Sequence, residues 1–477
     1  MICLLLICAS VQCMHAQTLV GGRILSDSIW TLAGSPYIVT TSILVDSGVT
    51  LTIRPGAVVK FNKFNNIGTA LQISGRLIAR GKSDSLITFT SGQTSPAAGD
   101  WGYLFFNSSS ANAQYDTGGN YVGGSILEYC TVNYAGGAAV TNNGAVRMDN
   151  AHPFISHTAI QYNSASGICG WNLTGRIKID NSIISNDTSA EKGGGIYLSE
   201  SGSSPTGTGS ITIVNSIVHG NASSGPGGGV YAFAHDIVIS NNVIDSNTSS
   251  GVASGDGGGI YASGNSATIS NNSIRRNASN FTGTFTSGSF NGGGIFIASG
   301  AQGLFDGTGS LYNNLISGNS ASGCGGGIYV ADGDISVFKN LVTYNEDFDN
   351  VPNPPICGGG IRVTNGTVAI SENTFAYNIS HGHGGGIYVS GGTVTISKNA
   401  IGNNRAYLTG GGIGITGGTV SCSHNEIGNN VAQNGSAMSC SGSDSLNIGY
   451  NTISGNAATG TAPTATIYLV EHSRPML

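Results

Sequence analysis

The chain has 477 residues, of which 76 are glycine and 9% are charged, and its net charge is −6. Charged residues make up roughly a quarter of a typical globular protein, and no basic patch or stripe is present, which argues against a nucleic-acid partner. A regular spacing of Ile and Val argues against disorder, because these side chains supply the buried area that disordered chains lack.

Residues 1–16 are expected to be a signal peptide. Residues 2–11 are apolar, and Met14-His15-Ala16 resembles the small-residue site at which such peptides are cleaved. The sequence therefore predicts a secreted or cell-surface protein. No later segment has about 18 continuous apolar residues, so no membrane span is expected.

Residues 24–125 are expected to form an N-terminal cap and the first rungs of a β-solenoid. Short segments with period-two alternation, typical of strands, lie at 42–45, 49–53, 57–61, 71–79 and 87–89. A looser stretch occupies residues 93–125, and the alternating pattern resumes at residue 126.

A unit of three glycines and an aliphatic residue recurs through the rest of the chain. The copies lie at 193–196, 227–230, 257–260, 292–295, 325–328, 358–361, 384–387 and 410–413. Such a short period indicates a solenoid, in which each unit buries its apolar face against its neighbours. Residues 126–456 are therefore expected to be one repetitive body.

Each repeat contains short strands and a pair of asparagines. In the clearest copy, Ile387 and Val389 flank Tyr388, a turn follows at residues 391–392, and residues 393–397 alternate again. Asparagines five residues apart recur at 242/247, 272/277, 314/319, 340/345, 373/378, 399/404, 425/430 and 451/456. The pattern predicts a parallel β-helix whose asparagines adopt the left-handed corner conformation and hydrogen-bond to the next turn.

Residues 51–61, LTIRPGAVVKF, resemble the first rungs of secreted bacterial proteins with the right-handed β-helix, or pectin-lyase-like, fold. The glycine units and asparagine pairs resemble the repeats of polymorphic outer-membrane proteins. The resemblance covers residues 24–456 and implies an all-β, single-stranded right-handed parallel β-helix solenoid with three short strands per turn. Residues 457–477 then look like an incomplete final rung of a longer protein. This fold hosts lyases, hydrolases, epimerases and adhesins, so it implies no single activity.

An aromatic residue follows most of the glycine units. The positions are Tyr197, Tyr231, Tyr261, Phe296, Tyr329 and Tyr388, with Arg362 in the place before the last. Period two places these side chains opposite the buried Ile and Val, hence outward. They are candidates for a glycan-binding ladder, and the alternative is cross-rung stacking that only stabilises the solenoid.

Loops in three successive turns carry residues suited to acid–base chemistry. The candidates are Glu346, Asp347 and Asp349 in the first loop, His381 and His383 in the second, and Arg405 and Tyr407 in the third. Stacking is expected to bring these loops together on one edge, where they have the parts for acid–base work on a polysaccharide. The carboxylates alone could bind Ca²⁺, although no cofactor or metal is expected. The alternative is a set of ordinary polar loops.

Cys324 and Cys357 each precede a glycine unit and occupy equivalent positions in successive turns. Stacked turns lie about 4.8 Å apart, within the Cα separation that a disulfide needs. This spacing makes them candidates for a disulfide, and the alternative is two small buried thiols.

These patterns favour a secreted or cell-surface, non-catalytic β-helix that is adhesin-like or glycan-binding. Its partner would be a polysaccharide, a cell-surface glycan, or a surface protein of a host or neighbouring cell. The alternative is a polysaccharide lyase, hydrolase or epimerase that uses the three loops. A third hypothesis is ice binding through an outward column of hydroxyls at Thr367, Thr393, Thr395, Thr419 and Ser421.

Overall fold

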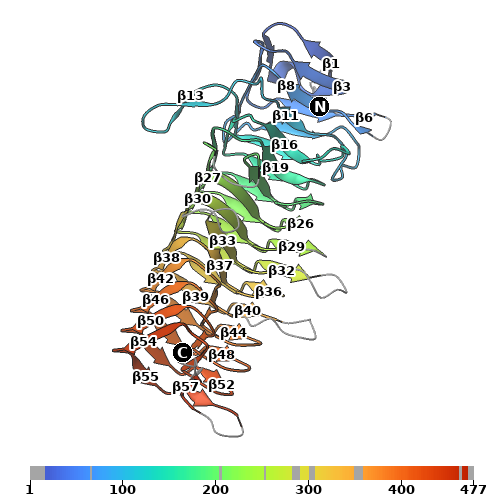
Figure 1. The fold of residues 1–477 in the computed structure, drawn as a ribbon. Helices are drawn as coiled ribbons and strands as arrows, with labels where there is room; N and C mark the ends of the chain where they lie inside the picture. The colour runs from blue at the N-terminus through green and yellow to red at the C-terminus, as the bar shows by residue number, and fades with distance from the viewer. Residues whose placement is uncertain are drawn as a thin grey trace, which may run out of the picture.

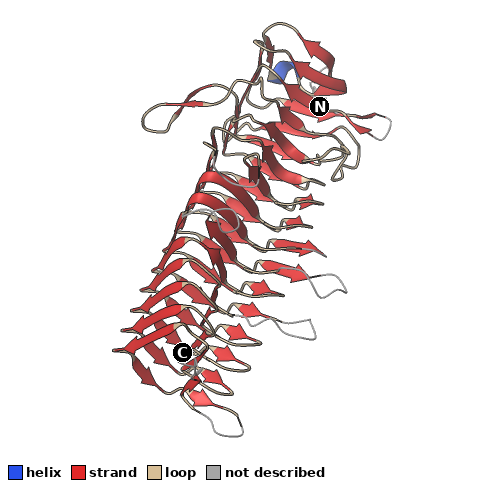
Figure 2. Ribbon diagram, viewed as in Figure 1, coloured by secondary structure: helices blue, strands red, loops and turns tan. Residues whose placement is uncertain are grey.

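The computed structural model describes residues 17–64, 67–202, 207–251, 254–281, 290–299, 307–348, 358–460 and 465–470. The predicted signal peptide lies outside these residues. The described chain winds into one elongated stack of strands that runs from the N-terminal to the C-terminal end (Figure 1). Strands and turns make up nearly all of it (Figure 2), and the helical residues described are the single 3₁₀ turn η1, Leu32–Gly34.

The first rungs form the N-terminal end of the stack. Their strands are β1 (Thr18–Ile24), β2 (Ser28–Trp30), β3 (Tyr37–Val45), β4 (Thr50–Ile53), β5 (Val58–Phe61), β8 (Leu71–Ile73), β9 (Arg76–Arg80), β10 (Ile87–Ser91) and β11 (Leu104–Phe106). Two antiparallel hairpins interrupt them, namely β6 (Lys63–Phe64) with β7 (Ile67–Gly68) and β12 (Gln114–Tyr115) with β13 (Tyr121–Gly123). The second hairpin occupies part of the stretch whose pattern was looser, and Figure 1 shows it projecting from the body.

The first face of the repetitive body contains the eight strands that follow the glycine units, β23 (Ile196–Ser199) to β49 (Ile413–Ile415). Its strands are β16 (Gly144–Asp149), β19 (Ser166–Trp171), β23 (Ile196–Ser199), β27 (Val230–Ser240), β30 (Ile260–Ser270), β33 (Ile295–Ser299), β37 (Ile328–Asp332), β41 (Ile361–Val363), β45 (Ile387–Val389), β49 (Ile413–Ile415), β53 (Met438–Ser441) and β57 (Ile467–Val470). Successive strands pair in parallel, which confirms the predicted parallel β-helix.

The second face comes next in each turn. It comprises β14 (Ile126–Glu128), β17 (Phe154–Ser156), β20 (Arg176–Asp180), β24 (Ser210–Val214), the second halves of β27 and β30, β34 (Thr308–Tyr312), β38 (Asp334–Phe338), β42 (Thr367–Ser371), β46 (Thr393–Ser397), β50 (Thr419–Ser423) and β54 (Ser445–Gly449).

The third face comprises β15 (Cys130–Asn133), β18 (Ala159–Gln161), β21 (Ile183–Ser185), β25 (Ile217–His219), β28 (Val243–Asp245), β31 (Ser273–Arg275), β35 (Leu315–Ser317), β39 (Leu341–Thr343), β43 (Thr374–Ala376), β47 (Ala400–Gly402), β51 (Glu426–Gly428) and β55 (Thr452–Ser454).

A fourth face adds a very short strand to the three that were predicted per turn. Its strands form a separate parallel sheet: β22 (Thr188–Ser189), β26 (Ala222–Ser223), β29 (Thr248–Gly251), β32 (Ala278–Phe281), β36 (Ser320–Ala321), β40 (Glu346–Asp347), β44 (Ile379–Ser380), β48 (Arg405–Ala406), β52 (Val431–Ala432) and β56 (Ala457–Ala458). Most span two residues, too few for a period-two pattern to reveal.

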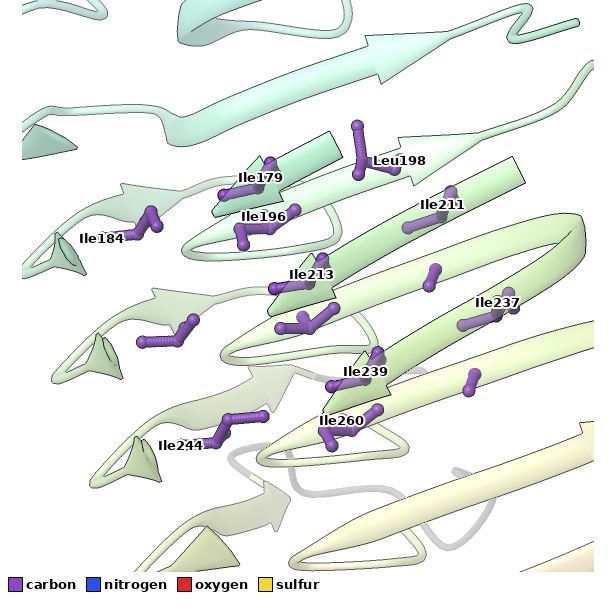
Figure 3. Packing of buried hydrophobic residues seen from close by; sticks show 14 of the residues in the cluster. Ile179, Ile184, Ile196, Leu198, Ile211, Ile213, Ile237, Ile239, Ile244 and Ile260 are labelled. Carbon is purple, nitrogen blue, oxygen red and sulfur yellow. The ribbon is translucent and has the colours of Figure 1, made fainter. Parts of the chain in front are cut away.

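Columns of aliphatic side chains fill the interior between the faces. Ile179, Ile213 and Ile239 pair in register on the second face, opposite Ile196 and Ile260 of the first, and none is exposed (Figure 3). Burying each such side chain contributes about 1.5–3 kcal/mol. The core is therefore one continuous column along the stack.

Each glycine of a triplet is required for its own reason, as residues 384–386 show. Gly384 has a φ of +66°, in the region where other residues are strained. A Cβ on Gly385 would lie 2.6 Å from the carbonyl oxygen of Arg405, and one on Gly386 would lie 2.8 Å from that of Gly412. The triplet therefore marks a point at which successive turns approach too closely for a side chain.

The paired asparagines form two buried ladders along the stack. Asn404 is representative: its Nδ2 donates to the Phe375 carbonyl at 2.9 Å, and its backbone N–H and Nδ2 both donate to Asn430 Oδ1. The prediction that these asparagines adopt the left-handed conformation is wrong, since the residue before each ladder position does so, such as Lys398 and Asn403. The left-handed residue that turns the chain precedes the ladder asparagine by one position, because the ladder side chain itself must point into the stack.

Candidate functional site

Three successive fourth-face strands bring together four of the predicted loop residues. Glu346 on β40 pairs in register with Ile379 on β44, which pairs with Arg405 on β48. His381 and Tyr407 follow β44 and β48 directly. We call Glu346, His381, Arg405 and Tyr407 the edge patch.

Direct contacts join the members of the edge patch. His381 Nε2 and Glu346 Oε1 are 2.9 Å apart, and their side chains are 35% and 44% exposed. The His381 ring lies 4.8 Å from the Tyr407 ring at a tilt of 50°, and the Arg405 guanidinium lies 4.5 Å from the centre of the Tyr407 ring. Tyr407 is 42% exposed. The patch is thus a pre-arranged surface with an acid, a base and an aromatic ring.

The other loop candidates lie elsewhere. Asp347 is buried, and its carboxylate accepts a hydrogen bond of 2.7 Å from the His381 backbone N–H; burial raises the pKa of this carboxyl well above its ordinary value. His383 Nδ1 is 2.7 Å from the Thr409 hydroxyl, and burial lowers the pKa of its ring. Asp349 lies outside the described residues. Asp347 and His383 therefore support neighbouring segments rather than the outward surface.

Two exposed tyrosines that sequence analysis missed lie at the corner before the fourth face. Tyr344 and Tyr377 are 61% and 48% exposed, and their rings stack at 5.0 Å with an angle of 5°. Both have the left-handed conformation and directly precede the ladder residues Asn345 and Asn378. Their place before a ladder asparagine was the available signal, because the side chain at that position points outward.

The predicted aromatic column exists, but its rings cover one another. Consecutive ring centres from Tyr197 through Tyr231, Tyr261 and Phe296 to Tyr329 are 5.2, 4.7, 4.9 and 5.2 Å apart, and the rings are stacked. Tyr231 is 6% exposed, and burial raises the pKa of its hydroxyl to about 12. The rings do lie on the side of the strands opposite the buried Ile and Val, as expected. However, most ring faces are covered by neighbouring rings, so few are available to a ligand.

Arg362 continues the column in place of a ring. Its guanidinium lies 5.7 Å from the Tyr329 ring centre and 5.5 Å from that of Tyr388. Tyr388 is fully buried, and its hydroxyl is 2.6 Å from that of Thr416. A flat cation can occupy an aromatic stack because the ring faces carry negative charge, so the stack runs unbroken from Tyr197 to Tyr388.

A hollow lies beside the N-terminal end of this column. It has a volume of about 370 Å³ and is lined by Tyr197, Pro226, Ser224, Gly225, Ser254, Glu191 and Lys192. Lys192 Nζ is held 3.4 Å from the Tyr231 hydroxyl. On its other side Tyr197 pairs in register with Cys169, and no ring of the described residues stacks on that face. Tyr197 is therefore the column residue best placed for a ligand.

The cysteines among the described residues are buried. Cys130, Cys169, Cys422 and Cys440 are free thiols, and burial raises the pKa of Cys422 to about 12. Cys324 Sγ accepts a hydrogen bond from Arg362 Nη1. Its candidate disulfide partner, Cys357, lies outside the described residues, so the bridge stays a hypothesis.

The described residues contain neither a candidate metal site nor a helix that could span a membrane. No group of three or more His, Cys, Asp or Glu side chains there is placed to hold a metal ion. The same part of the chain has no helix long and apolar enough to cross a membrane.

Comparisons with known proteins agree with this geometry. The model of the right-handed β-helix region matches residues 103–274 and 305–474, and that of the pectate-lyase-like β-helix domain matches residues 22–148. The chain belongs to the right-handed β-helix family, as its first rungs and repeats had indicated. The searches of curated proteins and of solved structures returned no match.

Proposed function

We propose that this β-helix is an exported, non-catalytic protein that binds a glycan at the cell surface or outside the cell. The observation that carries the proposal is the edge patch, where a partly exposed tyrosine ring lies among an arginine, a histidine and a glutamate. Sugars are recognised by apolar contact with ring faces and by polar groups that bond their hydroxyls. The patch has both.

The surroundings of the patch support an extended ligand. Tyr344 and Tyr377 precede the same strands and add two exposed rings. The stacked turns hold these groups on a rigid backbone, which lowers the entropy lost when a chain of sugars binds. The hollow beside Tyr197, with a volume of about 370 Å³, is a second candidate place for a sugar unit, several turns away. A surface protein of a host or neighbouring cell is the other partner that such a surface would suit.

A panel of polysaccharides tests the proposal by retention of the purified chain. Tyr407→Ala and Arg405→Ala are expected to lose retention of the polysaccharide that binds, while Tyr162→Ala, a tyrosine of similar exposure on an earlier turn, retains it. Absence of retention on every polysaccharide, or equal retention by all variants, would overturn the proposal.

A polysaccharide lyase, hydrolase or epimerase is the second candidate. The observation in its favour is the Glu346–His381 pair at 2.9 Å, since hydrogen-bonded acid–base pairs move protons in catalysis. Against hydrolysis by a carboxylate pair, Asp347 is buried below the patch. Release of reducing ends or unsaturated products that Glu346→Gln abolishes would establish the enzyme, and retention without turnover would favour binding.

A further inference from the structure

The outward side of the second face carries two parallel columns of short polar side chains. The first column is Ser266, Thr308, Asp334, Thr367, Thr393, Thr419 and Ser445, and the second is Thr268, Ser310, Ser336, Ala369, Thr395, Ser421 and Asn447. Asp334 is the one charged residue among these positions, and most of the others carry a hydroxyl. We call them the hydroxyl face. The sequence pattern predicts only its central turns, at Thr367, Thr393, Thr395, Thr419 and Ser421.

The hydroxyls at the centre of this face are open to an outside partner. Thr367, Thr393, Thr395 and Thr419 are exposed. In the described part of the chain, no hydrogen bond joins the Thr393, Thr395 or Thr419 hydroxyl to another protein group. These side chains therefore have their full hydrogen-bonding capacity left for water or a ligand.

The hydroxyl face is regular in two directions. Neighbouring turns repeat at about 4.8 Å, and alternate residues of one strand repeat at about 6.7 Å. Threonine is β-branched and stiff at its first side-chain torsion, and the parallel sheet fixes its backbone. The grid of hydroxyls and methyls is therefore preformed, so binding a partner costs little further side-chain entropy.

These properties define the chemistry of the partner. Near-absence of charge disfavours an ionic polymer, and a two-dimensional repeat suits a partner that itself repeats in two dimensions. From Thr367 to Ser421 neither column contains an aromatic ring, the group that packs on flat sugar faces. What fits is a neutral lattice of hydrogen-bonding groups whose repeats resemble those of this grid in size.

We propose that the hydroxyl face binds the surface of an ice crystal. The same columns upstream contain Arg176, Lys178 and Asp236, so the columns carry little charge only from the turn of Ser266, and they carry none from the turn of Thr367 to that of Ser445. The proposal does not depend on glycan binding, because the edge patch lies on the fourth face.

The test is partition of the purified full-length chain into slowly grown ice, with thermal hysteresis as a second readout. Thr395→Lys places a long, hydrated charge at the centre of the face and is expected to reduce partition to the level of a non-binding globular protein. Thr374→Lys makes the same change at an exposed threonine of the third face and is expected to leave partition unchanged. Far-ultraviolet circular dichroism would verify that both variants are folded.

Partition of the natural chain no greater than that of the non-binding protein would overturn the proposal. Equal loss of partition in the two folded variants would also overturn it, because the effect would then not be specific to this face. Adsorption to crystalline cellulose or chitin that Thr395→Lys abolishes, without partition into ice, would assign the face to a crystalline glycan instead.

Discussion

The buried asparagine ladder and the edge patch beside it follow opposite rules. Asn345, Asn378 and Asn404 are the same residue in three successive turns, whereas the next residues, Glu346, Ile379 and Arg405, all differ. A ladder position must accept from one turn and donate to another, which an amide of this length does. The outward position makes no such hydrogen bonds, so its residue type can vary. A residue type that repeats in every turn therefore indicates a role in holding the turns together, and a position whose residue type varies is where a ligand site can arise.

The largest expected effect comes from breaking the ladder. Asn378→Ala removes the Oδ1 that accepts from Asn345 N and Nδ2, leaving two buried donors unpaired. We expect a loss of about 3 kcal/mol of unfolding free energy, measured by urea denaturation, with faster hydrogen exchange in the adjoining turns.

Asn403→Gly is the matched control for the ladder. It alters an asparagine at the outward, left-handed position, where φ is +58° and glycine is tolerated, so stability should change little. Equal losses in the two variants would contradict the ladder argument.

The next effect is a gain in stability from repairing the ladder at Asp187. This buried residue takes an asparagine position: its Oδ1 accepts from Asn163, and its Oδ2 has no hydrogen-bond partner among the described residues. Burial raises the pKa of its carboxyl well above the ordinary value. Asp187→Asn should stabilise the chain by about 2 kcal/mol at pH 7, because the amide needs no proton.

The sign of the pH dependence follows from this raised pKa. The folded chain holds the Asp187 proton more tightly than the unfolded chain, whose carboxyl has a pKa of about 3.9. Stability of the natural chain therefore falls as pH rises from about 4 towards the folded pKa. Melting curves should show the advantage of Asp187→Asn widening over that interval. Asp334→Asn makes the same change at an exposed aspartate, and an equal widening there would contradict the attribution to burial of Asp187.

A smaller effect is expected in the aromatic column. Arg362→Met keeps an apolar stem but removes the guanidinium between Tyr329 and Tyr388. The expected loss is about 1 kcal/mol, seen as a lower melting temperature. An unchanged melting temperature would mean that the column gains nothing from the cation.

The smallest effect on stability is expected in the edge patch. Tyr407→Ala removes a partly exposed ring and should change the unfolding free energy by less than about 0.5 kcal/mol, even where it abolishes glycan retention. A large destabilisation would show that Tyr407 is part of the framework and would remove the contrast between ladder and patch.

The alternating segments and the spacing of the glycine units predicted the solenoid and most strands of its three main faces. They did not predict the fourth-face strands, because two residues show no periodicity. They placed Glu346, His381, Arg405 and Tyr407 on one edge, as the structure does, but also counted Asp347, whose side chain points inward. The inward or outward direction of a residue in such a short strand depends on the bend before it.

By itself, the sequence determined the period, the identity of the buried columns and the family, because these depend on short-range alternation repeated many times. Only the tertiary structure decided which faces stay open. Tyr231 and Tyr344 both recur as aromatic positions and both rings stack on a neighbouring turn, yet Tyr231 is buried and Tyr344 is exposed. The difference arises from what the adjacent turns place above and below each ring, and contacts between turns exist only once the chain has wound into its stack.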